Sequence, residues 1–169
     1  PPVLSRDGVS LTVANTRRNL PEALSPQIKS TNFLNNILAK RESIAAGTFD
    51  SLFLNWKDEL TECTVSNLFF ISGKTLHTPA LDCGILDGIT RTIVMTLAQE
   101  EGIPVREGHY HLADLQRAEE CFLTNTSMEI IPVNRVDSFA IGDGRPGSLT
   151  RRLQTRFADS RTRFLEPPS

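Results

Sequence analysis

The sequence predicts a mixed α/β fold of the α+β kind. Segments in which apolar residues alternate with a period of two, typical of strands, are interspersed with segments of helical period. Neither an internal repeat nor the regular rhythm of a parallel βαβ sheet is present. The 169 residues, 39% of them hydrophobic, are enough for one domain with a sizeable core.

The expected strands are runs rich in β-branched and aromatic residues that turn signals separate. Gly73 in the segment 72–74 marks a hairpin turn, and Pro79 closes the strand after it. A loop with several breakers covers 16–25. The expected strands cover 8–13, 49–55, two strands within 60–71, 75–78, 105–110, 120–124 and 129–136.

The expected helices follow capping signals and the 3.6-residue period. Asn32 is expected to cap the first helix, and Gly47 to end it. Gly102 ends the second helix, and a glycine-rich loop precedes the last one. The expected helices cover 32–46, 89–101, 112–118 and 148–158.

Charge and hydropathy exclude several classes of partner. The formal net charge is −2, and no basic run extends beyond pairs such as Arg17-Arg18, so there is no electrostatic footprint for nucleic acid. The longest strongly apolar stretch, 68–71, is far too short to span a bilayer. The first twenty residues carry charges where a signal peptide needs an apolar core. We therefore expect a cytoplasmic protein with no nucleic-acid or membrane partner.

The cysteines and histidines predict no metal site. Cys63, Cys83 and Cys121 are odd in number and lack paired spacing, which indicates reduced, mostly buried thiols. His109 and His111 lie two residues apart, but no acidic or cysteine third ligand accompanies them at a useful spacing.

Lys29 is the candidate nucleophile. It lies just before the first expected helix, at a predicted strand-to-helix junction, with small polar residues after it. A lysine in a sheltered cleft is poorly solvated, which disfavours its ammonium form and allows Schiff-base chemistry. The alternative is a surface lysine whose stem covers apolar neighbours.

Glu62 is the candidate acidic partner of a cofactor. It stands in an otherwise uncharged run that leads into a buried strand. A buried carboxylate needs a partner, and the protonated ring nitrogen of a cofactor would be one. The alternative is an exposed carboxylate at the start of a strand.

Two turns are candidate phosphate sites. The second expected helix begins after a glycine, so the amides of Ile89 and Thr90, the Thr90 hydroxyl and the helix dipole could bind a phosphate. Such helix starts also serve for capping alone. Short polar side chains at 124–127, among them Asn125 and Thr126, could contact the same phosphate or form an ordinary turn.

In this order, the motifs resemble the C-terminal part of the fold-type IV, pyridoxal-phosphate-dependent class IV aminotransferases. That family includes branched-chain amino acid aminotransferases, D-amino acid aminotransferases and aminodeoxychorismate lyases. The resemblance runs from about Lys29 to Phe157. Its motifs are Ile28-Lys29-Ser30-Thr31-Asn32, Thr61-Glu62 ahead of Asn67-Leu68-Phe69, Gly84-Ile85-Leu86, Gly88-Ile89-Thr90-Arg91, Glu129-Ile130-Ile131-Pro132 and Gly142-Asp143-Gly144.

The resemblance implies the large C-terminal domain of the D-amino acid aminotransferase-like fold, with a mixed sheet or pseudo-barrel flanked by helices. It implies pyridoxal 5′-phosphate as cofactor. Lys29 would form the Schiff base and move the substrate proton, and Glu62 would keep the pyridine nitrogen protonated. The other cofactor-binding residues that it implies are Leu86, Ile89, Thr90, Asn125 and Thr126.

The resemblance also divides the chain. A strand and connecting loop (1–26) lead into a cofactor-binding domain (27–160) and a tail (161–169), and nothing corresponds to the family's smaller N-terminal domain. We expect transamination of an amino acid to a 2-oxo acid by a homodimer of the full-length protein, with little turnover by this chain alone. An aminodeoxychorismate lyase-type reaction, or a non-catalytic fragment that binds a partner subunit, are the alternatives.

Overall fold

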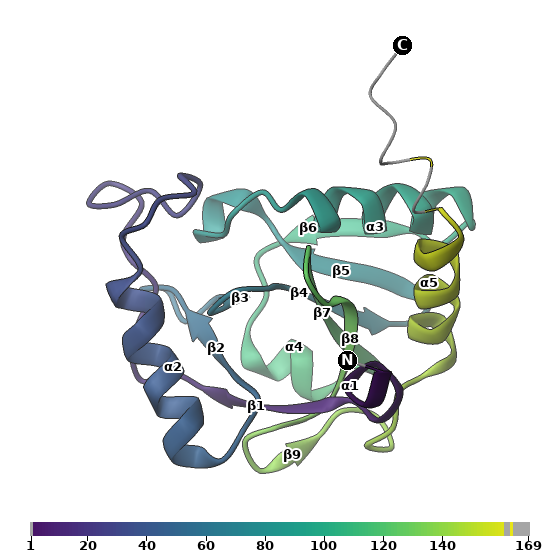
Figure 1. The fold of residues 1–169 in the computed structure, drawn as a ribbon, viewed down its shortest axis with the longest axis horizontal. Helices are drawn as coiled ribbons and strands as arrows, with labels where there is room; N and C mark the ends of the chain where they lie inside the picture. The colour runs from purple at the N-terminus through teal and green to yellow at the C-terminus, as the bar shows by residue number, and fades with distance from the viewer. Residues whose placement is uncertain (1, 161–162, 164–169) are drawn as a thin grey trace.

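The computed structural model describes residues 2–160 and 163, and its centre is a nine-stranded mixed sheet (Figure 1). Six strands close into a ring in the order β3-β2-β1-β8-β7-β4, because β3 pairs with β4 as well as with β2. The mixed sheet or pseudo-barrel that the family resemblance implied is confirmed as a closed mixed sheet. The strands are β1 (Val9–Val13), β2 (Asp50–Leu54), β3 (Leu60–Cys63), β4 (Asn67–Ser72), β5 (Thr75–Pro79), β6 (Val105–Gly108), β7 (Glu120–Asn125), β8 (Glu129–Val136) and β9 (Phe139–Ala140).

The ring is built from both kinds of strand pairing. β1 is parallel to both of its neighbours, β2 and β8. The β2–β3, β3–β4, β4–β7 and β7–β8 pairs are antiparallel. β5 and β6 extend the sheet outward from β4, and β9 pairs with β8. The strand expected within 1–26 is therefore an integral part of the ring.

Helices flank the ring on more than one side (Figure 1). α3 and α5 contact each other and also contact β7, and α5 contacts β8. α2 lies against β1 and β2 instead. The helices are α1 (Pro2–Asp7), α2 (Leu34–Ala46), α3 (Ile89–Glu100), α4 (Leu112–Gln116) and α5 (Ser148–Asp159), with a 3₁₀ turn η1 (Leu81–Cys83).

β4 shows how one strand serves two cores. Leu68 and Phe70 join a cluster with residues of β1, β2, β7 and β8 as well as Leu115 of α4. Phe69 and Ile71 instead join the cluster formed with α3 and α5, where Phe69 stacks on Phe122 at 5.1 Å between ring centroids. Successive side chains of a strand point to opposite faces, so a strand covered on both faces is apolar throughout. This explains the uninterrupted apolar run at 68–71.

Most expected elements are present, whereas β9 and η1 were not expected and two further differences concern helices. α2 begins at Leu34 after Phe33, which makes no side-chain cap hydrogen bond, so the prediction of Asn32 as the cap is wrong. Gly47 does end that helix, in the left-handed conformation. α1 was not expected, since the strand at 8–13 was the first expected element. A proline is tolerated in the first turn of a helix, where its missing N–H has no partner to lose.

Part of the expected tail, 161–162 and 164–169, lies outside the described residues. Within residues 2–160 and 163, no helix combines the length and the apolar character needed to cross a membrane.

Candidate functional site

A pocket of about 470 Å³ opens where the β3–β4 turn, the β7–β8 turn and the start of α3 meet the loop before α2. The residues that the sequence suggested come from four separate segments, and the fold brings all of them to this pocket. They are Lys29, Glu62, Leu86, Ile89, Thr90, Asn125 and Thr126. Their individual roles stay predictions.

Lys29 lies in the long loop between β1 and α2. No strand directly precedes it, so the predicted strand-to-helix junction is wrong. Lys29 is exposed and lines the pocket. The sheltered cleft expected around Lys29 is therefore not formed by the described residues of this chain.

Glu62 lies on β3 and is buried, so the alternative of an exposed carboxylate is wrong. Its Oε1 accepts a hydrogen bond from Arg18 Nη2 at 2.5 Å. Its Oε2 accepts hydrogen bonds from Asn67 Nδ2 at 3.0 Å and from the Leu86 amide at 3.1 Å. Burial raises the pKa of Glu62 to about 7, and the Arg18 guanidinium is the strongest opposing influence.

Arg18 is a pocket residue that the sequence did not reveal. Its guanidinium donates to Glu62 and to the Gly84 carbonyl at 3.1 Å, and it lies 5.2 Å from the centroid of the Phe53 ring. The Arg18 amide donates to the Leu54 carbonyl at 3.0 Å, which holds the loop against β2. Residues 18 and 62 share no sequence spacing, so only the assembled sheet places them together.

The N-terminus of α3 presents unused backbone donors to the pocket. Gly88 is the N-cap, without a side-chain cap hydrogen bond, and Ile89 and Thr90 open the helix. The first amides of a helix have no partner within the helix, and the dipole makes this end positive. A Cβ on Gly88 would lie 2.2 Å from Asn67 Oδ1. Glycine therefore allows Asn67 to approach the helix start closely. The free amides and the helix dipole make this end of α3 suited to an anion.

The β7–β8 turn uses its polar side chains in two ways. Asn125 Oδ1 accepts from the amides of Ser127 and Met128, and its Nδ2 donates to Ser66 Oγ at 2.9 Å. The Asn125 side chain thus stabilises the turn itself. Thr124 also lines the pocket, and its buried hydroxyl has no hydrogen-bond partner. A polar group of a bound ligand would satisfy that hydroxyl.

The three cysteines are buried and unpaired, as expected. Sequence spacing offered no third ligand beside His109, but the fold places Glu59 and Cys83, both distant in sequence, next to its ring. Glu59, Cys83 and His109 do not line the pocket described above.

Comparison with known proteins relates this chain to one family. The family model for amino-transferase class IV matches residues 1–136. A putative branched-chain-amino-acid aminotransferase of Methanocaldococcus jannaschii is 39% identical over 164 residues, which cover 97% of this chain and 57% of that protein. An aminodeoxychorismate lyase of Bacillus subtilis is 36% identical over 151 residues, which cover 89% of this chain and 50% of that protein.

Solved structures share the fold. The branched-chain amino acid aminotransferase of Escherichia coli superposes with a TM-score of 0.91 at 31% identity, over 94% of this chain and 53% of that one. The T.th. branched-chain amino acid aminotransferase, solved with pyridoxamine 5′-phosphate, gives 0.89 at 29% identity, over 92% and 52%. The chain thus spans about half the length of these relatives. With most of its length matched by the family model and by these relatives, the chain belongs to the amino-transferase class IV family.

Proposed function

We propose that this chain is the cofactor-binding part of a pyridoxal 5′-phosphate-dependent aminotransferase, which transfers an amino group from an amino acid to a 2-oxo acid. The observation that carries the proposal is that Lys29, Glu62 and the N-terminus of α3 all border one pocket. An amine, a buried carboxylate and an anion site are the three features that this cofactor requires of a protein.

Each feature has a distinct task. Lys29 would hold the cofactor aldehyde through its amine, and its amine would then move the proton between the substrate Cα and the cofactor carbon C4′. Glu62, held by Arg18 and Asn67, would keep the ring nitrogen of the cofactor protonated. The amides at the start of α3 bind the phosphate. When bound, pyridoxal phosphate supplies the electron sink for the negative charge that develops at Cα.

The residues present fit the cofactor. The pocket volume lies within the roughly 300–1,000 Å³ range of small-molecule sites. The unpartnered Thr124 hydroxyl and the helix amides give hydrogen-bond donors on the phosphate side. Pyridoxamine 5′-phosphate in a relative of the same fold supports this assignment.

Two further observations support the proposed assembly and compartment. Apolar residues of α2 are exposed, among them Leu34 and Ile44 at 63% and 69% of their surface. Exposed apolar patches of this kind mark protein contacts, which supports a homodimer of the full-length protein. The unpaired thiols fit a reducing compartment, and we propose the cytoplasm.

The test is cofactor attachment in the full-length protein. We expect an absorption band on adding pyridoxal phosphate, which borohydride fixes, and mass spectrometry should then locate the cofactor on Lys29. Lys29→Ala should abolish both signals. Lys57→Ala is the matched control, because Lys57 is exposed and does not line the pocket. Attachment that survives Lys29→Ala would refute the proposed role of Lys29.

The B. subtilis relative makes a lyase the second candidate. Assays of 2-oxo acid formation from a panel of L- and D-amino acids, run beside assays of 4-aminobenzoate formation, separate the two reactions. Formation of 4-aminobenzoate without 2-oxo acid would replace transamination by the lyase reaction and leave the cofactor assignment intact.

A further inference from the structure

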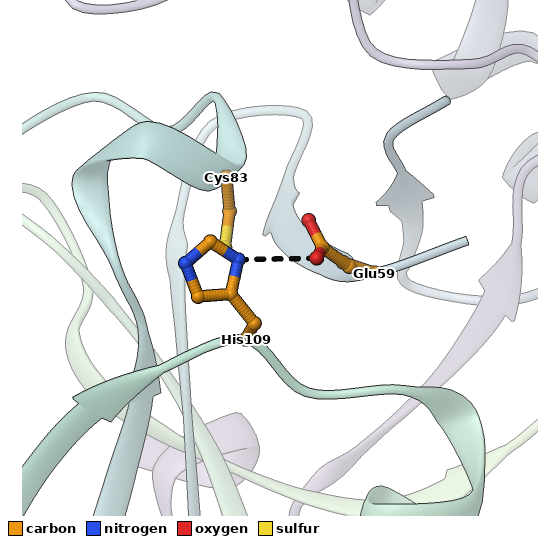
Figure 2. Close-up of side chains that lie close together, drawn as sticks. All are labelled: Glu59, Cys83 and His109. Atoms are coloured by element: carbon orange, nitrogen blue, oxygen red, sulfur yellow. Dashed lines mark hydrogen bonds and ion pairs between the residues drawn. The ribbon is translucent and has the colours of Figure 1, made fainter. Parts of the chain in front are cut away.

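Glu59, Cys83 and His109 form a compact group outside the candidate active site (Figure 2). One ligand atom of each lies within 4.8 Å of the others. His109 Nδ1 is 3.1 Å from Glu59 Oε1 and 3.5 Å from Cys83 Sγ. We propose that these three side chains bind a Zn²⁺ ion through Oε1, Sγ and Nδ1, with the fourth position open to water.

The ligand chemistry selects the ion. Thiolate sulfur, imidazole nitrogen and carboxylate oxygen are the three donors that zinc uses in proteins, in tetrahedral arrangement. Mg²⁺ and Ca²⁺ prefer oxygen donors alone. Three protein ligands and an open position correspond to a zinc site that is accessible from solvent. The side chain of His109 is 44% exposed, so an ion can reach the group from that side.

Neighbouring groups orient two of the ligands. The other ring nitrogen of His109, Nε2, lies 3.3 Å from Asp82 Oδ2. A carboxylate on the second nitrogen fixes the ring orientation and increases the basicity of the ligating nitrogen. Asn55 Nδ2 donates to Glu59 Oε2 at 2.7 Å, which leaves Oε1 directed at His109. These contacts position the ligands before any ion binds.

The backbone also holds the three segments in place. Glu59 precedes β3, Cys83 ends η1 and His109 follows β6. The Leu60 amide donates to the Tyr110 carbonyl at 2.6 Å, and the Ala80 amide donates to the Gly108 carbonyl at 3.0 Å. The ligand set therefore rests on three hydrogen-bonded segments. An ion would connect all three, and its binding would release the Cys83 thiol proton to solvent.

The test uses metal-free full-length protein and Co²⁺ as a spectroscopic probe, with Zn²⁺ as competitor. Tetrahedral Co²⁺ with a thiolate ligand gives visible ligand-field bands and a thiolate-to-cobalt charge-transfer band. We expect both bands to appear stoichiometrically and to vanish when Zn²⁺ is added. Zn²⁺ should also raise the melting temperature, since it binds the folded state.

The variants assign the ligands. Cys83→Ser should remove the charge-transfer band, and His109→Gln should abolish stoichiometric binding. Asp82→Asn changes an exposed residue and should weaken binding by about 10- to 100-fold, as loss of an orienting group does. His111→Gln is the matched control and should bind as wild type does.

Two sets of results would contradict the proposed zinc site. Absence of both bands in the wild-type protein would show a hydrogen-bonded group without a metal and would overturn the proposal. Bands that persist in both Cys83→Ser and His109→Gln, or that disappear in His111→Gln, would overturn the ligand assignment. Circular dichroism of each variant verifies folding, and the exposed position of His109 keeps that variant informative if Cys83→Ser does not fold. None of these readouts depends on cofactor attachment at Lys29.

Discussion

The ion pair between Arg18 and Glu62 is almost fully withdrawn from water, with 7% of each side chain exposed. Removing one partner of a buried pair leaves an uncompensated charge. At a pH above about 7, where Glu62 is ionised, Arg18→Met should therefore lower the free energy of unfolding by about 3–5 kcal/mol. The measurement is urea unfolding of the cofactor-free protein.

Arg17 provides a matched control for that variant. It pairs with Asp58 at 2.6 Å, but both side chains are about half or more exposed. Arg17→Met should cost at most about 1 kcal/mol, because surface pairs contribute little. The double variant Arg18→Met/Glu62→Gln should recover part of the stability lost in Arg18→Met. Equal losses in Arg17→Met and Arg18→Met would contradict the interpretation.

Glu62 also predicts a pH dependence. Burial raises its pKa from 4.5 to about 7, so between these values the folded state binds more protons than the unfolded state. The contribution of Glu62 to stability is therefore fully present below about pH 4.5 and declines as the pH rises through about 7. Unfolding of cofactor-free wild type and Glu62→Gln at about pH 5 and about pH 7 measures it. We expect the wild type to lose roughly 1–3 kcal/mol more than the variant over this interval. Parallel profiles would contradict the prediction.

The pocket residues that could be predicted from the sequence are those with a recognisable local sequence pattern. A glycine before a helix and an acid inside an uncharged run are visible in the chain itself, as for Gly88 and Glu62. Arg18 was missed because an arginine in a loop has no local signature. The Glu59, Cys83 and His109 group was missed for the same reason, since its members become neighbours only through sheet pairing.

At the scale of elements, α5 is capped by a residue from another part of the chain. Glu120 of β7 accepts hydrogen bonds from the amides of Leu149 and Thr150, at 3.0 and 2.7 Å. A carboxylate at a helix N-terminus also interacts favourably with the dipole. Glu120→Gln should lower the free energy of unfolding by about 1–2 kcal/mol, measured by chemical denaturation.

Gly147 lies next to the capping Glu120 carboxylate and can be varied to test the cap. A Cβ on Gly147 would lie 2.0 Å from Glu120 Cδ, so Gly147→Ala must displace the capping carboxylate. The effects of Gly147→Ala and Glu120→Gln should therefore be less than additive. Glu22→Gln, on the exposed loop before α2, should change stability by no more than about 0.5 kcal/mol. Full additivity would show that Gly147 and Glu120 act independently.

Most elements could be predicted because their local signals agree with their tertiary surroundings. The helix stop at Gly47 and the hairpin at Gly73 each require a positive φ, which glycine provides without strain. The start of α2 could not be predicted in this way, because its N-cap, Phe33, makes no side-chain cap hydrogen bond. The residue at which α2 begins depends on contacts with the preceding loop, such as the hydrogen bond from Asn35 Nδ2 to the Arg17 carbonyl.

For the whole molecule, closure of the ring is the feature that local sequence does not encode. It depends on the parallel pairing of β1 with β2 and β8, which joins Val9 to Val133 and Leu11 to Asp50 across long stretches of chain. Such non-local pairings follow from burial on both faces of the sheet. The closed barrel was predicted from the resemblance to a known family, whereas the individual strands and helices were predicted from the periodicity of apolar residues.

The outer face of α2 gives the prediction that concerns assembly. Leu34, Ile37 and Ile44 lie on one stripe of the helix and are more than half exposed. They belong to no core cluster of the described residues, so replacing them should hardly change the stability of this chain. If this stripe forms the contact between subunits, as we propose, a charge there must be buried without a partner.

We therefore expect Ile37→Lys/Ile44→Lys to weaken dimerisation of the full-length protein by at least about 10-fold, since burying an unpaired charge costs more than about 1.4 kcal/mol. Sedimentation equilibrium measures the dimer dissociation constant, and thermal unfolding verifies that the fold is intact. Val3→Lys is the matched control, because Val3 is 58% exposed and belongs to α1, a helix that lies away from α2 (Figure 1). An unchanged dissociation constant in the double variant would remove α2 from the subunit contact, and a similar loss in Val3→Lys would attribute the effect to net charge.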